Sequence, residues 1–238
     1  MLRCFFEKGN EDPAVLFSGT KIMEAGGQYL SHLGRYPVIS LSLKSMKQPS
    51  RELSLAMLKR AVGEEFSRHW PAVLESGRLT EAALERYLRI RDLKGSDADY
   101  ADALKYLSEC LHTCLDEKVV ILIDEYDVPL ENAWFHGFYN DILFPVRSLF
   151  ESALKTNENM AFAVVTGCLR ISRESIFTGL NNLKIMSITD DSYSEYFGFT
   201  QQEVEQMLDF YGLSENTETV RQWYDGYCFG NTEVYNPW

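Results

Sequence analysis

The chain has 238 residues and a formal net charge of −12, with 45% hydrophobic and 24% charged residues. These values are ordinary for a soluble globular protein built as one large domain, or as a domain with a small appendage. The negative charge argues against a broad nucleic-acid-binding surface, because contacts to phosphates need Lys and Arg. No apolar run approaches the roughly 18 residues of a membrane helix, and the charged N-terminus does not resemble a signal peptide, so we expect a cytoplasmic protein with no membrane partner.

The five cysteines include no CxxC pair. Cys110 and Cys114 lie one helical turn apart, but His112 between them points to another side of a helix. We therefore expect reduced thiols here and no metal site.

The first half of the chain predicts a compact apolar strand at 36–43. Apolar residues at helical spacing predict a helix over 51–70, and a second helix covers 77–92 with Thr80 as a candidate N-cap. Ser96 is placed to cap a third helix. The apolar stripe of this third helix consists of Tyr100, Leu104, Leu107, Leu111 and Leu115.

Aliphatic runs in the second half predict strands at 119–123 and 161–166 and a weaker strand at 183–188. A predicted helix over 138–156 separates the first two of these strands. Strands that alternate with helices indicate an α/β fold with a parallel sheet flanked by helices. We expect strands 38–43, 119–123 and 161–166 to pair side by side and in parallel, with 119–123 in the centre.

The C-terminal part combines a helix with a hairpin. Thr200 and Glu203 form a capping box, which predicts a helix starting near residue 200. Turn signals between aromatic residues predict a small hairpin within 223–238. The favoured role of its aromatic residues is core packing, ahead of base stacking; these residues are Trp223, Tyr224 and Tyr227.

Three carboxylates follow the central strand directly: Asp124, Glu125 and Asp127. Ligands of open α/β sheets bind beyond the carboxyl ends of the strands. Four or more aliphatic residues followed by Asp-Glu form a Walker B pattern, in which the Asp holds Mg²⁺ and the Glu orients or deprotonates the attacking water. Alternatively, Asp124 and Glu125 only end a strand at solvent, while Asp127 caps a helix with Pro129 in its first turn.

The phosphate loop that accompanies a Walker B segment, GxxxxGK[ST], does not occur in the sequence. Gly19-Thr20-Lys21 lacks the upstream glycine, and Gly26-Gly27 is not followed by Lys.

Several stretches together match one family. The most specific combination is IDEYD at 123–127 with the TG…SIF.GLNNL and WYDGY.FG patterns. The stretches are MLRCFFEKG (1–9), LFSGTKI (16–22), YPVISLSLK (36–44), VVILIDEYDVPL (119–130), VVTGCLRISRESIFTGLNNL (164–183), YFGFTQQEV (196–204) and WYDGYCFGNTEVYNPW (223–238). Over almost its whole length the chain resembles the AAA-ATPase-like domain of a bacterial family that pairs it with a C-terminal PD-(D/E)XK nuclease-like domain.

This resemblance implies a fragment. The Walker A segment of the family stands just before the stretch that the N-terminus resembles, and the nuclease-like domain follows downstream. The implied fold is a P-loop NTPase-like sheet missing its first strand, which makes residues 1–195 an incomplete core and 196–238 a small helical and hairpin subdomain. In the family the missing strand lies between 161–166 and 183–188. Strand 183–188 should therefore either pair directly with 161–166 or stand apart as an unpaired segment. We expect marginal stability and self-association through an unpaired strand edge.

The resemblance assigns roles residue by residue. Asp124 matches the metal-holding aspartate and Glu125 the catalytic base. Thr166 stands where a polar residue meets the γ-phosphate or its water, although a turn or cap role remains equally open. Arg170 and Arg173 follow as candidate phosphate sensors or arginine fingers, with surface positions as the alternative. Asp127 is favoured as a structural residue.

The implied function is ATP binding and hydrolysis with Mg²⁺ in a longer parent that carries the phosphate loop. Its partners would be ATP and the downstream nuclease-like domain, and it would meet nucleic acid only indirectly. The basic cluster Arg86, Arg89, Arg91 and Lys94 is either a solvated face or a phosphate contact. The alternative function is a non-catalytic binding or regulatory module that uses a degenerate P-loop fold.

Overall fold

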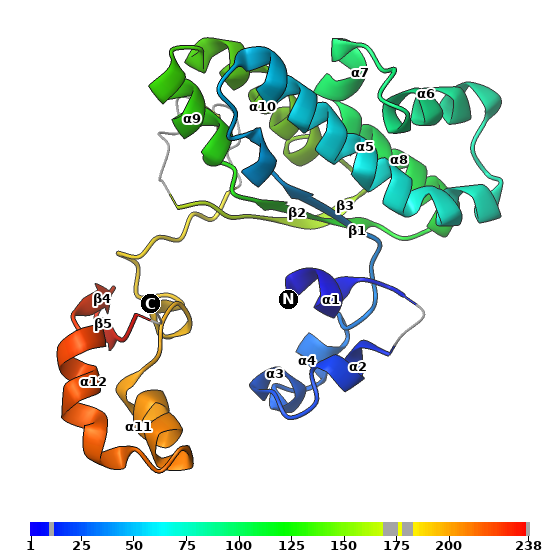
Figure 1. The fold of residues 1–238 in the computed structure, drawn as a ribbon. Coiled ribbons are helices and arrows are strands. Elements are labelled where there is room, and N and C mark those ends of the chain that lie inside the picture. The colour runs from blue at the N-terminus through cyan, green and yellow to red at the C-terminus, as the bar shows by residue number, and fades with distance from the viewer. Residues whose placement is uncertain (10–11, 169–175, 178–182, 237–238) are drawn as a thin grey trace. The chain divides into compact units, whose positions relative to one another are not determined.

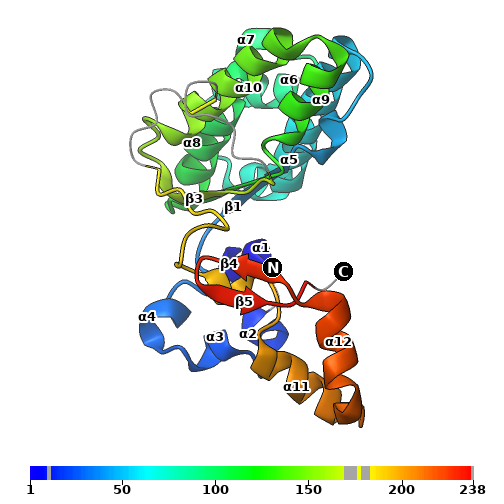
Figure 2. The same cartoon turned by 90° about the vertical axis from the view of Figure 1, so that its left-hand side faces the viewer.

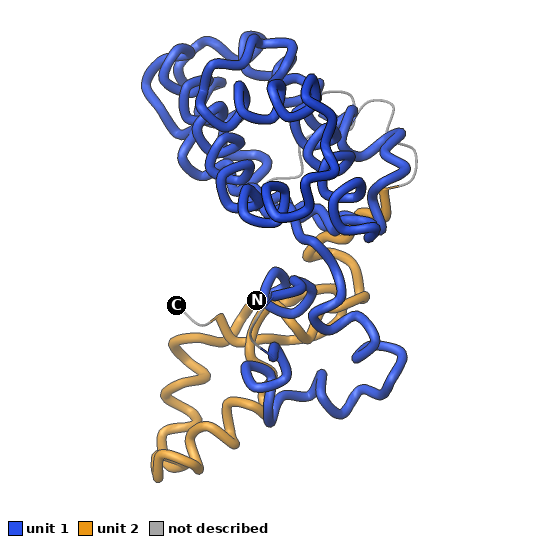
Figure 3. Tube along the Cα trace, turned by 90° about the vertical axis from the view of Figure 1, so that its right-hand side faces the viewer, with its two compact units in different colours: residues 1–181 blue, residues 182–238 orange. Residues whose placement is uncertain are grey.

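The computed structural model describes residues 1–9, 12–168, 176–177 and 183–236. Figure 1 shows the fold, and Figure 3 shows its two compact units, residues 1–181 and 182–238. The predicted boundary after residue 195 lies inside the second unit. No helix among the described residues is long and apolar enough to cross a membrane.

The first unit is an α/β domain. Its elements are α1 (Leu2–Phe6), α2 (Pro13–Leu16), α3 (Lys21–Glu24), α4 (Gly27–Leu30), β1 (Val38–Ser42), the 3-10 helix η1 (Lys44–Met46), α5 (Arg51–Ser76), α6 (Glu81–Arg91), α7 (Asp97–Ala101), α8 (Ala103–Leu115), β2 (Val119–Asp124), α9 (Val128–His136), α10 (Tyr139–Leu154) and β3 (Met160–Val165).

The sheet has the predicted order and direction. It runs β1-β2-β3, and both pairs are parallel, so the prediction of a central 119–123 strand is confirmed. The helices α5, α8 and α10 lie on one side of the sheet (Figures 1 and 2), while Phe6 of α1 packs edge-on against Phe162 of β3 at 5.0 Å between ring centroids. Covered faces explain why Val119, Val120 and Ile121 have no exposed surface.

The third strand is less covered than the central one. Ala161 is exposed, and the other residues of β3 are only half-buried, whereas most of β2 is buried. Within the described part of the chain no strand pairs with the free edge of β3. This edge is therefore the place where a further strand or another chain has room to pair.

The helices differ from prediction in two places. The side chain of Ser50 caps the N-terminus of α5. The sequence predicts that this helix ends at residue 70, but it continues through Pro71 to Ser76. Val73 beyond the proline is buried, so tertiary packing outweighs the low helix propensity of proline. The single helix predicted after Ser96 is two helices. Ser96 and Asp99 cap α7 with a capping box, and the backbone leaves the helical region at Asp102 before α8 begins. Thr80 caps α6 as predicted.

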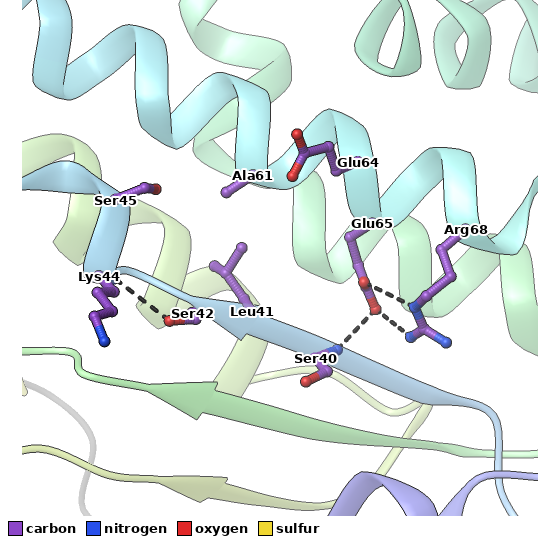
Figure 4. Close-up of a pocket in the computed structure, with 9 residues that line it drawn as sticks. All are labelled: Ser40, Leu41, Ser42, Lys44, Ser45, Ala61, Glu64, Glu65 and Arg68. Carbon is purple, nitrogen blue, oxygen red and sulfur yellow. Dashed lines mark hydrogen bonds and ion pairs between the residues drawn. The ribbon is translucent and has the colours of Figure 1, made fainter.

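The outer edge of β1 is closed by side chains of α5. Glu65, only 6% exposed, accepts a hydrogen bond from Ser40 N at 2.7 Å and one from Arg68 Nε at 3.0 Å (Figure 4). Arg68 also donates to the Val38 carbonyl and pairs with Glu7. The Val38 carbonyl and the Ser40 N–H thus have side-chain partners, which makes this edge less available to another strand.

A shallow groove of about 570 Å³ lies along the same edge (Figure 4). Its lining comes from β1, the η1 turn and α5, and consists of Ser40, Leu41, Ser42, Lys44, Ser45, Ala61, Glu64, Glu65 and Arg68. Of the predicted site residues that the structure describes, Asp124, Glu125 and Thr166, none lines it.

The second unit holds short elements: the 3-10 helices η2 (Ser194–Tyr196) and η3 (Ser214–Asn216), α11 (Gln201–Phe210), α12 (Thr217–Tyr224), β4 (Tyr227–Phe229) and β5 (Thr232–Val234). The Thr200–Glu203 capping box is confirmed, and so is the hairpin, in which β4 and β5 pair antiparallel.

The weaker strand predicted at 183–188 does not form, and these residues are an unpaired segment, which is one of the two predicted outcomes for them. Gly230 N donates to the Ile188 carbonyl, a hydrogen bond made outside any strand pair. Core packing is wrong for the three C-terminal aromatic residues. Trp223 at the end of α12 is 78% exposed, and Tyr224 of α12 and Tyr227 of β4 are exposed as well. The unit is too small to enclose so many large side chains.

Candidate functional site

The candidate site lies at the carboxyl end of the sheet. Asp124 is the last residue of β2 and stands opposite Ser42, the last residue of β1, while Thr166 follows the last residue of β3. Parallel strands bring these three ends to one edge, which is the usual ligand position of an open α/β sheet. The structure therefore brings Asp124, Glu125 and Thr166 together as three neighbouring residues.

The Asp124 carboxylate is exposed but held in a fixed direction. Its Oδ1 accepts hydrogen bonds from Thr166 Oγ1 at 2.5 Å and from Glu125 N at 3.0 Å, and its backbone carbonyl accepts one from Leu43 N at 3.0 Å. No hydrogen bond from a described residue reaches Oδ2. That oxygen is free to face a ligand, while the bonds to Oδ1 restrict how the carboxylate turns.

Glu125 occupies a bulge. Thr166 N donates to the Ile123 carbonyl at 2.8 Å, and in a regular parallel ladder the Thr166 carbonyl would then accept from residue 125. It accepts from Tyr126 N instead, at 3.1 Å, so Glu125 is an extra residue with φ of 56°. Bulges next to functional sites redirect a side chain, and left-handed backbone in a non-glycine residue persists only where surrounding contacts fix it.

These residues fit a magnesium ion bound to a nucleotide. Mg²⁺ is usually held by one or two carboxylates together with substrate phosphates and water, so a single exposed aspartate at this edge is a sufficient protein ligand. Among the described residues no group of three or more His, Cys, Asp or Glu side chains is arranged to hold a metal by itself. Cys110 and Cys114 are buried and free, and burial raises the pKa of Cys110 to about 12, as expected for inert thiols.

The remaining predicted residues divide into three groups. Arg170 and Arg173 lie outside the described residues. Pro129 is in the first turn of α9 and Asp127 is at its N-cap position, as the alternative interpretation predicts, but the Asp127 side chain makes no cap bond. In the basic cluster the three arginines already have acidic partners: Arg86 pairs with Asp99 and Asp102, Arg89 with Asp99, and Arg91 with Asp92.

Asp127 and Gly167 contribute more to the site than their sequence pattern indicates. The Asp127 carboxylate accepts a hydrogen bond from Cys168 N at 2.9 Å, and a Cβ at Gly167 would lie 2.6 Å from Asp127 Oδ1. Two features of the sequence point to this contact: Gly167 follows Thr166 directly, and Asp127 is the third carboxylate after the strand.

One comparison with known proteins identifies a family. The family model described as "Predicted AAA-ATPase" matches residues 1–177. An uncharacterized protein in the vnfD 5′ region of Azotobacter chroococcum mcd 1 is 34% identical over 129 residues, which are 53% of this chain and 24% of that protein, so the match spans about a quarter of the relative. No solved structure matches the chain. From the family match and the parallel sheet, the chain belongs to the family of predicted AAA-ATPases.

Proposed function

We propose that the sheet edge formed by Asp124, Glu125 and Thr166 is the metal- and water-handling half of an ATP-hydrolysing site. The observation that carries the proposal is the exposed Asp124 carboxylate at the end of a buried parallel strand. Two hydrogen bonds hold its Oδ1, and no described residue bonds its Oδ2. Buried aliphatic residues leading into such an exposed carboxylate are typical of the nucleotide sites of P-loop proteins.

Each residue has a separate task in this proposal. Asp124 would hold Mg²⁺, which when bound would supply positive charge to the phosphates of ATP. Glu125 accepts a proton from the water that attacks the γ-phosphate. Thr166 holds the Asp124 carboxylate through its hydroxyl, and Arg170 is a candidate contact to the phosphates.

The phosphates also need backbone amides and a lysine, which a GxxxxGK[ST] loop supplies. We place that loop in a longer protein that includes this chain, together with a nuclease-like domain to which hydrolysis is coupled. Nucleic acid would then meet the partner domain and not this acidic chain.

Steady-state ATP hydrolysis by such a longer protein tests the proposal. We expect Glu125→Gln to lower kcat by about 100-fold or more, the usual contribution of a general base, while ATP still binds. Glu131→Gln changes another exposed carboxylate shortly downstream, in α9, and should have no effect. Equal activity of Glu125→Gln and the wild type would contradict the proposal. The 238-residue chain alone should show no turnover above background.

The absence of a GxxxxGK[ST] stretch from the sequence favours a second candidate, a non-catalytic binding or regulatory module. In that case the longer protein would bind its partner equally well with and without ATP, and Asp124 would be replaceable.

A further inference from the structure

The chain after β3 passes unusually close to the residues after Glu125. A Cβ placed on Gly167 would lie 2.6 Å from Asp127 Oδ1 and 2.6 Å from Tyr126 Cε1, closer than real side-chain atoms approach. Only glycine fits here, so the backbone at Gly167 rests directly on the Tyr126 ring and the Asp127 carboxylate.

The Asp127 side chain stabilises this contact between the segment after β3 and residues 126–127. It is 3% exposed, and its Oδ2 accepts a hydrogen bond from Cys168 N at 2.9 Å. A buried carboxylate requires hydrogen-bond donors, and a backbone N–H is a donor with a fixed direction. Although Asp127 stands at the N-cap of α9, its side chain binds the segment after β3 and not the first turn of its own helix.

Hydrogen bonds to the segment after β3 hold the chain on both sides of Glu125. On one side Asp124 is bound to Thr166 Oγ1, and on the other side Tyr126 N is bound to the Thr166 carbonyl and Asp127 to Cys168 N. The left-handed backbone of Glu125 has to be over-determined by its surroundings, and these bonds determine it from both directions.

We infer that Asp127 and Gly167 form a clamp that sets the position of the Glu125 carboxylate, so that Asp127 is a positioning residue of the reaction. This inference rests on the proposed function of Glu125 as the base. Asp127 acts through the backbone of residues 125–127 and through the segment 166–168, and not on the substrate itself.

Kinetics of the longer protein test the clamp. Asp127→Ala removes the acceptor of Cys168 N. We expect kcat to fall by about tenfold or more with KM nearly unchanged, because a misplaced base slows the chemical step without weakening substrate binding. Asp127→Asn keeps an oxygen acceptor and should regain much of the rate. Gly167→Ala pushes on the same carboxylate and should reproduce the Asp127→Ala loss. Glu131→Ala is the matched control in α9 and should behave as the wild type.

Hydrogen–deuterium exchange separates the clamp from the proposed function. Asp127→Ala should increase deuterium uptake in peptides covering 123–127 and 164–168, while Asp127→Asn and Glu131→Ala leave it unchanged. If the wild type shows no turnover but this exchange pattern appears, the clamp stands and the proposed function fails. If Glu125→Gln abolishes turnover while Asp127→Ala changes neither kcat nor uptake, the clamp is overturned and the function stands. A loss that Asp127→Asn does not recover, with KM raised equally, would also overturn the clamp.

Discussion

The hydroxyl of Thr166 donates a hydrogen bond to Asp124 Oδ1, joining the carboxyl ends of β2 and β3. The two residues are 42 positions apart in the sequence and become neighbours only because their strands pair in parallel. One oxygen of the carboxylate is thereby occupied, and no described residue bonds the other. The sheet register therefore determines the direction of the proposed metal ligand.

Thr166→Val keeps the shape of the side chain and removes this hydrogen bond. A hydrogen bond to a charged group contributes about 1.5–3 kcal/mol, so we expect Mg²⁺-dependent ATP affinity of the longer protein to fall by about tenfold or more. Thr113→Val is the control, because the Thr113 hydroxyl donates to the Glu109 carbonyl of its own helix, outside the candidate site. Titration of Mg²⁺ at fixed ATP measures the effect. Identical titrations for the two variants would show that the Thr166 hydroxyl does not hold Asp124.

The cap on the β1 edge, formed by the side chains of Glu65 and Arg68 of α5, should stabilise the folded protein. Glu65→Gln neutralises the more deeply buried of the two carboxylates that pair with half-buried Arg68, the other being Glu7, and we expect the free energy of unfolding to fall by about 2–3 kcal/mol. Glu64→Gln is the matched control, because Glu64 is exposed and pairs only with exposed Arg60. Urea denaturation of both variants at neutral pH gives the comparison. A loss of the same size in Glu64→Gln would contradict the role of the cap.

The same cap predicts a dependence on pH. Burial raises the pKa of Glu65, but hydrogen bonds from His69 and Arg68 and the charge of Arg68 outweigh burial and lower this pKa from 4.5 to about 2. A carboxylate with a lowered pKa stabilises the fold above its unfolded pKa and loses that contribution as the pH falls toward its folded pKa. The stability difference between wild type and Glu65→Gln should therefore be largest above pH 4.5 and shrink as the pH falls toward 2. A stability difference between the two proteins that stays constant over this pH range would contradict the lowered pKa of Glu65.

The free edge of β3 predicts self-association of the 238-residue chain. Apolar strand edges pair with other chains, and a charge placed on the strand opposes such pairing. Sedimentation velocity should show species larger than a monomer whose share grows with concentration. Ala161 is exposed, so Ala161→Lys should reduce this association without unfolding the domain. A chain that remains monomeric at every concentration would show that the edge is not available.

Local signals predicted much of this fold. Aliphatic runs gave three parallel strands in the right order, and the Thr80 and Thr200 caps mark helix starts as expected. The strand at 183–188 could not be judged in this way, because a strand exists only where a neighbour completes its hydrogen bonds. The continuation of α5 past Pro71 likewise depends on tertiary burial of Val73, which no local pattern reveals.

The site was predictable in its residue types and less so in its geometry. The run from Val119 to Asp124 indicated a carboxylate at a sheet end, and the structure places it there. The bulge at Glu125 and the contact between Asp127 and Gly167 arise from the approach of the segment after β3, which is distant in sequence. Spacing alone carries no signal for such an approach.

Mg²⁺-dependent ATP binding by Asp124→Asn and Glu125→Gln variants of the longer protein tests the central claim most directly. Metal holding and water activation are separate tasks on adjacent side chains, so the two variants should fail differently. We predict that Asp124→Asn loses the gain in ATP affinity that Mg²⁺ provides, whereas Glu125→Gln binds Mg²⁺ and ATP nearly as the wild type does and retains ATP unhydrolysed. Equal and mild effects of both substitutions would contradict the account and leave Asp124 and Glu125 as the solvent-exposed end of a strand.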